Sequence, residues 1–130
     1  MKRDLDLIRH ILLCVEESNE IPTRIESMVT EKYSLDDIAY NITLLNDAGY
    51  VVLYKHPALE SRTQRFYIER LTMAGCDYLD NVRDNKIWAK TKEAISNVAQ
   101  SASLDVIKNI AGSLINAAIA VAGIAINQIQ

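Results

Sequence analysis

The chain has few of the residues that build catalytic and metal sites. Its 130 residues include two histidines, two cysteines and four scattered glycines, and no glycine-rich phosphate loop occurs. His10 falls in a predicted helix and His56 near a predicted hairpin tip, and neither has a cysteine at ligand spacing, whereas zinc needs three or four such groups. We therefore expect no enzyme activity, no cofactor and no metal, and no small-molecule substrate is evident.

The chain also lacks an excess of basic residues and a leader-like start. Its net charge of −3 argues against a protein that coats nucleic acid through bulk charge. Lys2 and Arg3 are followed by Asp4 and Asp6, and not by the apolar run of a signal peptide. We expect a cytoplasmic protein.

With two cysteines, the chain has no disulfide framework. Cys14 and Cys76 fall on the apolar sides of predicted helices, so we expect two buried free thiols in a reducing cytosol. Hydrophobic residues make up 49% of the sequence, which argues against wholesale disorder and allows a proper core.

A capped amphipathic helix is predicted after Ser34. The Ser34 hydroxyl can accept a backbone N–H at the helix start, and Gly49 can take the left-handed conformation that ends such a helix. Between them, apolar residues recur at spacings of three and four: Leu35, Ile38, Ile42 and Leu45.

Two β-rich runs follow this helix. Residues 50–54 and 66–71 are rich in β-branched and aromatic side chains, and the eleven residues between them include Pro57 and several charges, which suits a hairpin tip. A helix that leads into a hairpin is the second half of a winged helix, a fold used mostly to bind DNA. The predicted core contains Leu35, Ile38, Ile42, Leu45, Val51 or Val52, Phe66, Ile68, Leu71, Leu79 and Val82.

The rest of the predicted fold is helical. A first helix is expected over residues 4–18, while Pro22 interrupts the segment 19–33, where we expect the second helix of a winged helix to be shortened or missing. Thr72 begins another helical region with a break near residues 84–85, and Trp88 is predicted to anchor the core or a subunit contact. The fold class is mainly α with a small β-hairpin: a winged helix-turn-helix domain over residues 1–95, and a C-terminal apolar helix within residues 96–130.

The last predicted helix, over residues 104–129, is unusually apolar. It has no charge over the seventeen residues 110–126, which is the lower edge of what a membrane span needs. Ser113, Asn116 and two glycines weaken the membrane interpretation, so we favour burial against a second copy or the chain's own domain. We predict a soluble homodimer, with contact residues Ile107, Leu114, Val121 and Ile124.

Three segments resemble a known family. They are MKRDLDLIRHILLCVEE, DDIAYNITLLNDAGYV and LTMAGCDYLDNVRDNKIWAKTKE. They are similar to the bacterial and phage-associated family called domain of unknown function 2513, over roughly residues 1–110. The third segment is the most specific, through Gly75, Tyr78, Leu79, Arg83 and Trp88. The resemblance implies a winged helix and no catalytic residue, because the family has no assigned activity.

The charges of the predicted helix and hairpin differ. A winged helix places the helix before its hairpin in the major groove, but here that helix presents three acids and no base. Tyr40 and Asn41 on this face could read a base, although relatives commonly carry histidine at position 41. The hairpin is better equipped to contact phosphate, through Lys55, Arg62 and Arg65.

Two functions fit this pattern. The first is a small dimeric DNA-binding protein, a transcriptional regulator or phage-related accessory protein that grips double-stranded DNA with its hairpin. The alternative is a winged-helix module that recruits a protein partner through its acidic helix face and apolar tail, without binding DNA.

Overall fold

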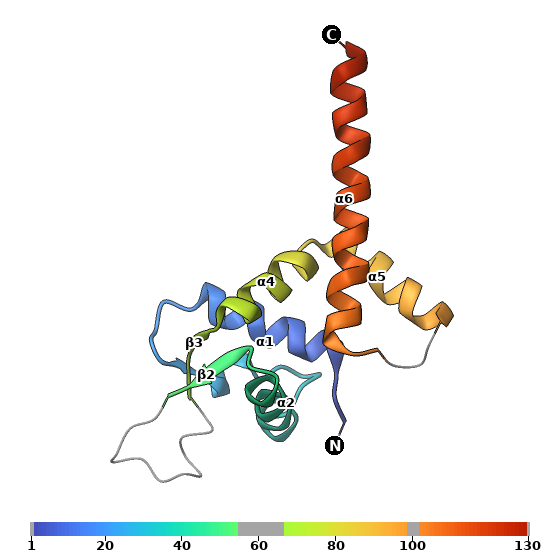
Figure 1. Ribbon diagram of the computed structural model, residues 1–130. Coiled ribbons are helices and arrows are strands. Elements are labelled where there is room, and N and C mark those ends of the chain that lie inside the picture. Colours follow the sequence, from blue (N-terminus) through green and yellow to red (C-terminus); the bar gives the residue numbers. More distant parts are fainter. Residues whose placement is uncertain (1, 55–66, 99–101, 130) are drawn as a thin grey trace. The chain divides into compact units, whose positions relative to one another are not determined.

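The computed structural model describes residues 2–54, 67–98 and 102–129. They form a mainly helical fold with a small three-stranded antiparallel sheet (Figure 1). The chain divides into two compact units, which we call unit 1 (Met1–Leu79) and unit 2 (Asp80–Gln130).

Unit 1 begins with a helix and an irregular segment. α1 (Leu5–Glu17) is capped by Asp4, whose side chain accepts the Leu7 N–H at 3.0 Å. After it come a two-residue strand, β1 (Thr23–Arg24), and one 3₁₀ turn, η1 (Ile25–Met28). The segment 19–33 therefore contains no α-helix, which agrees with the predicted loss or shortening of a helix there.

The next helix has the predicted start and stop. α2 (Leu35–Asp47) is capped by Ser34, whose hydroxyl accepts the Asp37 N–H at 3.2 Å. Gly49 follows with φ of 76°, and the Tyr50 N–H then bonds back to the Leu45 carbonyl at 2.9 Å. This left-handed turn sends the chain directly into the sheet.

The sheet has the strand order β1-β3-β2. β2 (Val51–Leu53) and β3 (Tyr67–Leu71) pair antiparallel as predicted, with Val51 opposite Leu71, and β1 adds Thr23 opposite Ile68. The segment between β2 and β3, including Phe66 of the predicted core, lies outside the described residues.

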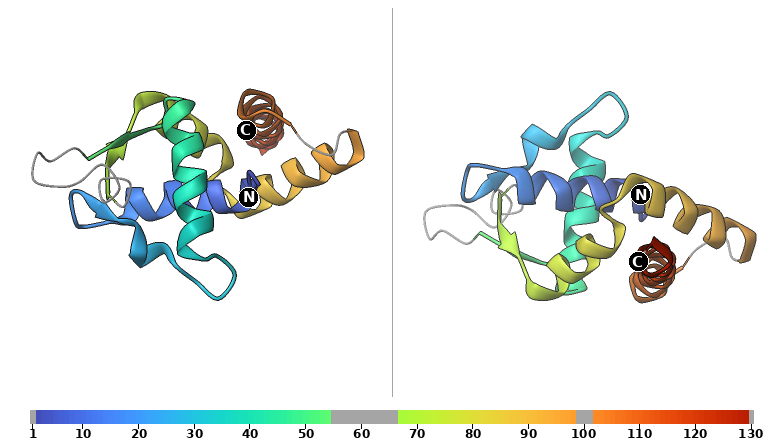
Figure 2. Two further views of the ribbon diagram at one scale, coloured as in Figure 1. Left: turned by 90° about the horizontal axis from the view of Figure 1, so that it is seen from below. Right: turned by 90° about the horizontal axis from the view of Figure 1, so that it is seen from above.

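The core of unit 1 lies where α1, α2 and the sheet meet, and α2 crosses α1 in both views of Figure 2. Leu35 and Leu71, predicted for this core, are only half-buried because each sits at the end of its element. The fully buried side chains of unit 1 include Leu7, Ile8, Ile11, Leu12, Ile25, Met28, Ile38, Ile42, Leu45, Ile68, Tyr78 and Leu79.

The start of α4 (Met73–Val82) is tied to the end of the α2 turn. Thr72 donates its N–H to the Tyr50 carbonyl at 3.0 Å, and its hydroxyl donates to the Gly49 carbonyl while accepting the Gly75 N–H. Gly75 packs so closely here that a Cβ atom would overlap the Tyr50 carbonyl oxygen. Only glycine fits this position.

Tyr78 is fully buried beside Tyr50, with ring centroids 5.3 Å apart. Its hydroxyl has no hydrogen-bond partner among the described residues. Burial is the main cause that raises the pKa of the Tyr78 phenol, so the group stays protonated at neutral pH. A buried donor without a partner destabilises the folded state.

Replacing Tyr78 by phenylalanine is therefore expected to raise the free energy of unfolding, by about 1 kcal/mol, because the ring stays and only the unpaired hydroxyl is lost. Urea denaturation followed by circular dichroism measures this change. Tyr50→Phe is the comparison at the adjacent ring, where no such gain is expected. A loss of stability in Tyr78→Phe would show that the hydroxyl has a partner in solution.

Unit 2 contains the end of α4 and two further helices. α5 (Asn85–Val98) starts at the predicted break, where Asp84 accepts the N–H groups of Lys86 and Ile87 at 2.9 and 3.0 Å. α6 (Leu104–Ile129) packs on α5, so α5 belongs with α6 and the division between units falls earlier than residue 95. Trp88 is buried, which confirms it as a core anchor.

Candidate interaction surfaces

Asn41 is the most informative polar residue of unit 1. We predicted it on the exposed face of α2, and this is wrong, since its side chain is 1% exposed. Its Oδ1 accepts the Asp4 N–H at 3.0 Å, and its Nδ2 donates to the Asp37 carbonyl at 2.9 Å and to the Lys2 carbonyl at 3.4 Å. These bonds engage both the oxygen and the nitrogen of the side-chain amide, so the amide is not available to read a base.

The reason lies in the helix geometry. Position 41 directly precedes buried Ile42 and lies three residues after buried Ile38, so it borders the apolar stripe of α2. The backbone that enters α1 passes there and supplies the groups that the amide satisfies. A pattern of apolar residues alone gives no sign of this long-range partner.

The rest of the α2 surface is acidic. Asp36, Asp37 and Asp47 are exposed, and Tyr40 is half-buried. The sequence has no lysine or arginine from residue 33 to residue 54, so this helix has no cation of its own to contact phosphate. The predicted nucleic-acid contacts Lys55, Arg62 and Arg65 lie outside the described residues.

A groove of about 330 Å³ opens where α1 ends, and we call it the α1 groove. It is lined by the C-terminal end of α1, the segment that leads into β1 with the first residue of β1, the last three residues of β3 and the start of α4. Its residues are Val15, Glu16, Ser18, Glu20, Ile21, Thr23, Glu69, Arg70, Leu71 and Cys76.

The lining of the α1 groove combines carboxylates with exposed apolar surface. The lining contains three carboxylates, those of Glu16, Glu20 and Glu69, and one guanidinium, that of Arg70. The net charge of the lining side chains is therefore negative. Ile21 is 83% exposed. Sequence patterns did not predict these residues as a site, because four separate segments contribute them and no local spacing relates them.

The bend that follows α1 is held by its own hydrogen bonds. The Ser18 hydroxyl accepts the Glu20 N–H at 3.1 Å and contacts the Glu20 carbonyl at 3.0 Å, and the Thr23 hydroxyl also donates to that carbonyl. These contacts fix the backbone that places Glu20 and Ile21 beside the groove.

Both cysteines are free thiols, as predicted, but neither is fully buried. Cys76 is exposed and lines the α1 groove. Cys14 is half-buried, and its Sγ lies 3.7 Å from His10 Nε2, so this pair does meet across one helical turn. Burial, with a smaller contribution from Glu17, raises the pKa of the Cys14 thiol and makes it a poor nucleophile.

His10 is already engaged in the fold. Its Nε2 lies 3.0 Å from the Met28 carbonyl oxygen, and its ring packs 5.8 Å from that of Tyr33. Over residues 2–54, 67–98 and 102–129, the structure has no group of three or more His, Cys, Asp or Glu side chains placed to hold a metal ion.

In unit 2, the predicted self-association residues have different environments. Ile107 is fully buried within the chain, so it is not available for contact with a second copy, and its prediction is corrected. Leu114 is half-buried, Val121 is 67% exposed, and the side chain of Ile124 lies outside the described residues.

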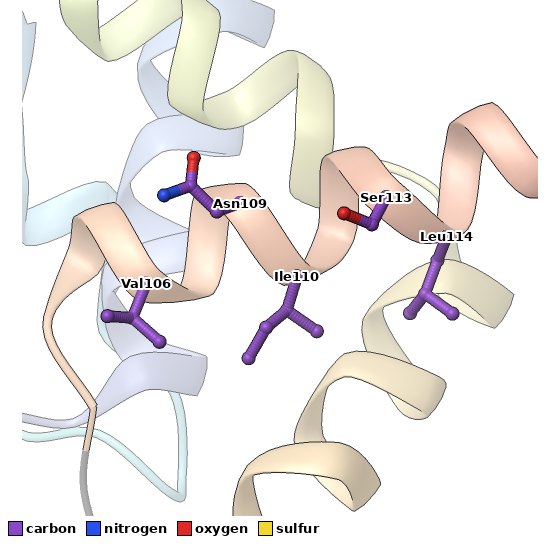
Figure 3. A pocket seen from close by; sticks show the side chains of 5 residues that line it. All are labelled: Val106, Asn109, Ile110, Ser113 and Leu114. Carbon is purple, nitrogen blue, oxygen red and sulfur yellow. The ribbon is translucent and has the colours of Figure 1, made fainter.

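The first half of α6 borders a shallow groove of about 370 Å³. Val106, Ile110 and Leu114 project from one side of the helix, with Asn109 and Ser113 beside them (Figure 3). Within the part of the chain that the structure describes, one stretch is long and apolar enough to cross a membrane. It comprises the 20 residues Leu104–Gly123, of which only Ile107 and Ala111 are buried.

Two comparisons with known proteins give matches. The family of hypothetical proteins designated DUF2513 matches residues 2–102, so the match ends just before α6 begins. An uncharacterised protein of Haemophilus influenzae is 29% identical over 116 residues, which cover 89% of this chain and 97% of that protein. No solved structure matches the chain. The family match covers most of this chain, so the chain belongs to the DUF2513 family, whose function is unknown.

Proposed function

We propose that unit 1 is a winged-helix module that binds a basic segment of a protein partner in the α1 groove. The element order α1, β1, η1, α2, β2, β3 and the strand order β1-β3-β2 support a winged helix whose second helix is reduced to one turn. The hairpin β2–β3 is then the wing, and α2 is the helix that DNA-binding members of this fold insert into the major groove.

The properties of α2 argue against that use here. Phosphate would be repelled by Asp36, Asp37 and Asp47, and DNA affinity depends largely on phosphate contacts with lysine and arginine. Asn41, the residue best suited to pair with adenine, is held inside the fold by three backbone groups. The surface of α2 is therefore poorly suited to DNA.

The observation that carries the proposal is the composition of the α1 groove. Val15, Leu71 and exposed Ile21 offer apolar contact, and three carboxylates around them outnumber the single guanidinium. Lysine and arginine complement such a surface, because their stems cover apolar atoms while their charged ends reach carboxylates. The partner segment is therefore rich in lysine or arginine and carries at least one apolar residue.

The test uses the full chain and a labelled peptide, Lys-Lys-Leu-Lys-Lys, with binding followed by fluorescence anisotropy. Replacing Glu16, Glu20 and Glu69 together by glutamine is expected to weaken binding about tenfold, because each exposed charge pair contributes roughly 0.5 kcal/mol. High salt is expected to weaken binding of the natural sequence in the same direction.

The control variant removes the same amount of charge elsewhere: Glu31→Gln, Asp36→Asn and Asp47→Asn, all exposed and outside the groove. It is expected to bind the peptide as the natural sequence does. Equal losses in both triple variants would contradict a groove site and indicate attraction by overall charge.

The alternative function, DNA binding, is tested on the same chain by a gel shift with double-stranded DNA of random sequence. If the chain binds DNA but not the peptide, and neutralising Lys55, Arg62 and Arg65 removes the shift, the wing grips DNA and the protein-partner proposal is wrong. No shift at low salt, together with peptide binding that depends on the groove, would support the proposal.

A further inference from the structure

We propose that the uncharged part of α6 inserts into a lipid bilayer and anchors the chain there. This inference does not depend on the binding function of unit 1. After Lys108 the sequence has no charged residue through Gln130. A helix rises 1.5 Å per residue, so about 20 residues cross a hydrocarbon core of about 30 Å. Residues 110–129 supply that length, and α6 is helical to Ile129. The first of these residues, among them buried Ala111, exchange their contacts with α5 for lipid when the whole length inserts.

Within unit 2, no described residue covers the middle of α6. Every residue from Asn116 to Gly123 is exposed, and all of them except Asn116 are apolar. A helix turns once in about 3.6 residues, so these positions complete two turns and include every face of the helix. In water, such a helix would expose a continuous apolar surface.

A bilayer matches this surface better than a second copy does. Ile119 is 63% exposed and Val121 is 67% exposed. Positions two apart on a helix differ in direction by about 200°, so these two side chains point to opposite sides. A single partner helix would cover one of them and leave the other in water, whereas lipid surrounds the helix completely.

The charges before this stretch agree with membrane insertion. Between residues 86 and 108 the four lysines Lys86, Lys90, Lys92 and Lys108 outnumber two acids, Glu93 and Asp105. Basic residues stay on the cytoplasmic side of a span and are attracted by anionic lipid headgroups. No side chain between Lys108 and Gln130 is charged, so insertion of this stretch buries no charged side chain.

The experiment is vesicle flotation. The full chain is synthesised in a cell-free system with vesicles of phosphatidylcholine containing one quarter phosphatidylglycerol, and the vesicles are then floated through a density gradient in high salt. We expect the natural sequence to float with the vesicles. Val121→Asp is expected to reduce the bound-to-free ratio on the order of a hundredfold, because a carboxylate at the centre of a span is strongly disfavoured.

The matched control is Val29→Asp, the same change at an exposed valine of unit 1. It is expected to float like the natural sequence. Flotation of Val121→Asp at the natural level would overturn the proposal. So would a natural chain that stays at the bottom of the gradient and forms a defined oligomer by light scattering, since that result assigns α6 to self-association.

Spanning is separated from surface adsorption by thiol labelling. A chain with Cys14→Ser, Cys76→Ser and Gln130→Cys carries one thiol at its last residue. A maleimide that does not cross membranes should label it only after detergent is added. Labelling in intact vesicles would overturn insertion across the bilayer.

Discussion

Replacing Gly75 by alanine is expected to lower the free energy of unfolding of unit 1 by about 3 kcal/mol, a typical upper value for overpacking a tight site. The added methyl group would overlap the Tyr50 carbonyl oxygen. That oxygen belongs to the backbone and accepts the Thr72 N–H, so it cannot move without breaking the contact that begins α4. Urea denaturation followed by circular dichroism measures the loss.

The expected loss of stability is opposite to the usual effect of replacing a helical glycine by alanine. Within a helix, alanine is normally more favourable than glycine by up to about 1 kcal/mol. Gly112 in α6 is the matched control, since the nearest atom to its added Cβ would be Asn81 Oδ1 at an ordinary 3.9 Å. Gly112→Ala should be neutral or stabilising. If Gly75→Ala behaves like Gly112→Ala, α4 does not approach Tyr50 as closely as described.

Replacing Asn41 by alanine is expected to cost about 2–3 kcal/mol, because a buried polar group loses its partner and a cavity forms. The Asp4 N–H and the carbonyls of Lys2 and Asp37 all lose a hydrogen-bond partner. Hydrogen exchange provides a direct measurement, since the Asp4 amide should be protected in the natural chain and exchange faster in the variant.

Asn46→Ala is the control in the same helix. Asn46 is exposed, and substitutions at such positions usually change stability by less than about 0.5 kcal/mol. If Asn41→Ala lowers the free energy of unfolding as little as Asn46→Ala does, and the Asp4 amide stays protected from exchange, Asn41 does not hold the N-terminal segment. If Asn41→Ala leaves folding intact and removes DNA binding, Asn41 reads a base.

Local signals were sufficient to predict much of unit 1. The Ser34 cap, the apolar spacing of α2 and the Gly49 stop each depend on neighbours within a few residues, and the structure confirms all three. The antiparallel pairing of β2 with β3 also follows from adjacent runs of β-forming residues. Local pattern is reliable where the interaction partners are close in sequence.

The candidate sites could not be predicted in the same way. The α1 groove joins residues from position 15 to position 76, and Asn41 bonds to a backbone group 37 residues earlier. Cys76 lies near the apolar positions of α4 in sequence, yet it is exposed. Only the tertiary arrangement decides such contacts. Lys55, Arg62 and Arg65 lie outside the described part of the chain, so their role in DNA binding stays a prediction.

The bonds of Asn41 have a consequence for how the chain is made. The residues that lead into α1 leave the ribosome before α2, and the side chain that satisfies the Asp4 amide belongs to α2 and is synthesised 37 residues later. Until α2 has emerged, the start of α1 lacks this partner and its buried apolar face lacks a surface to pack on. We therefore expect α1 to fray during synthesis and to become stable only together with α2, so that both helices form in one cooperative step.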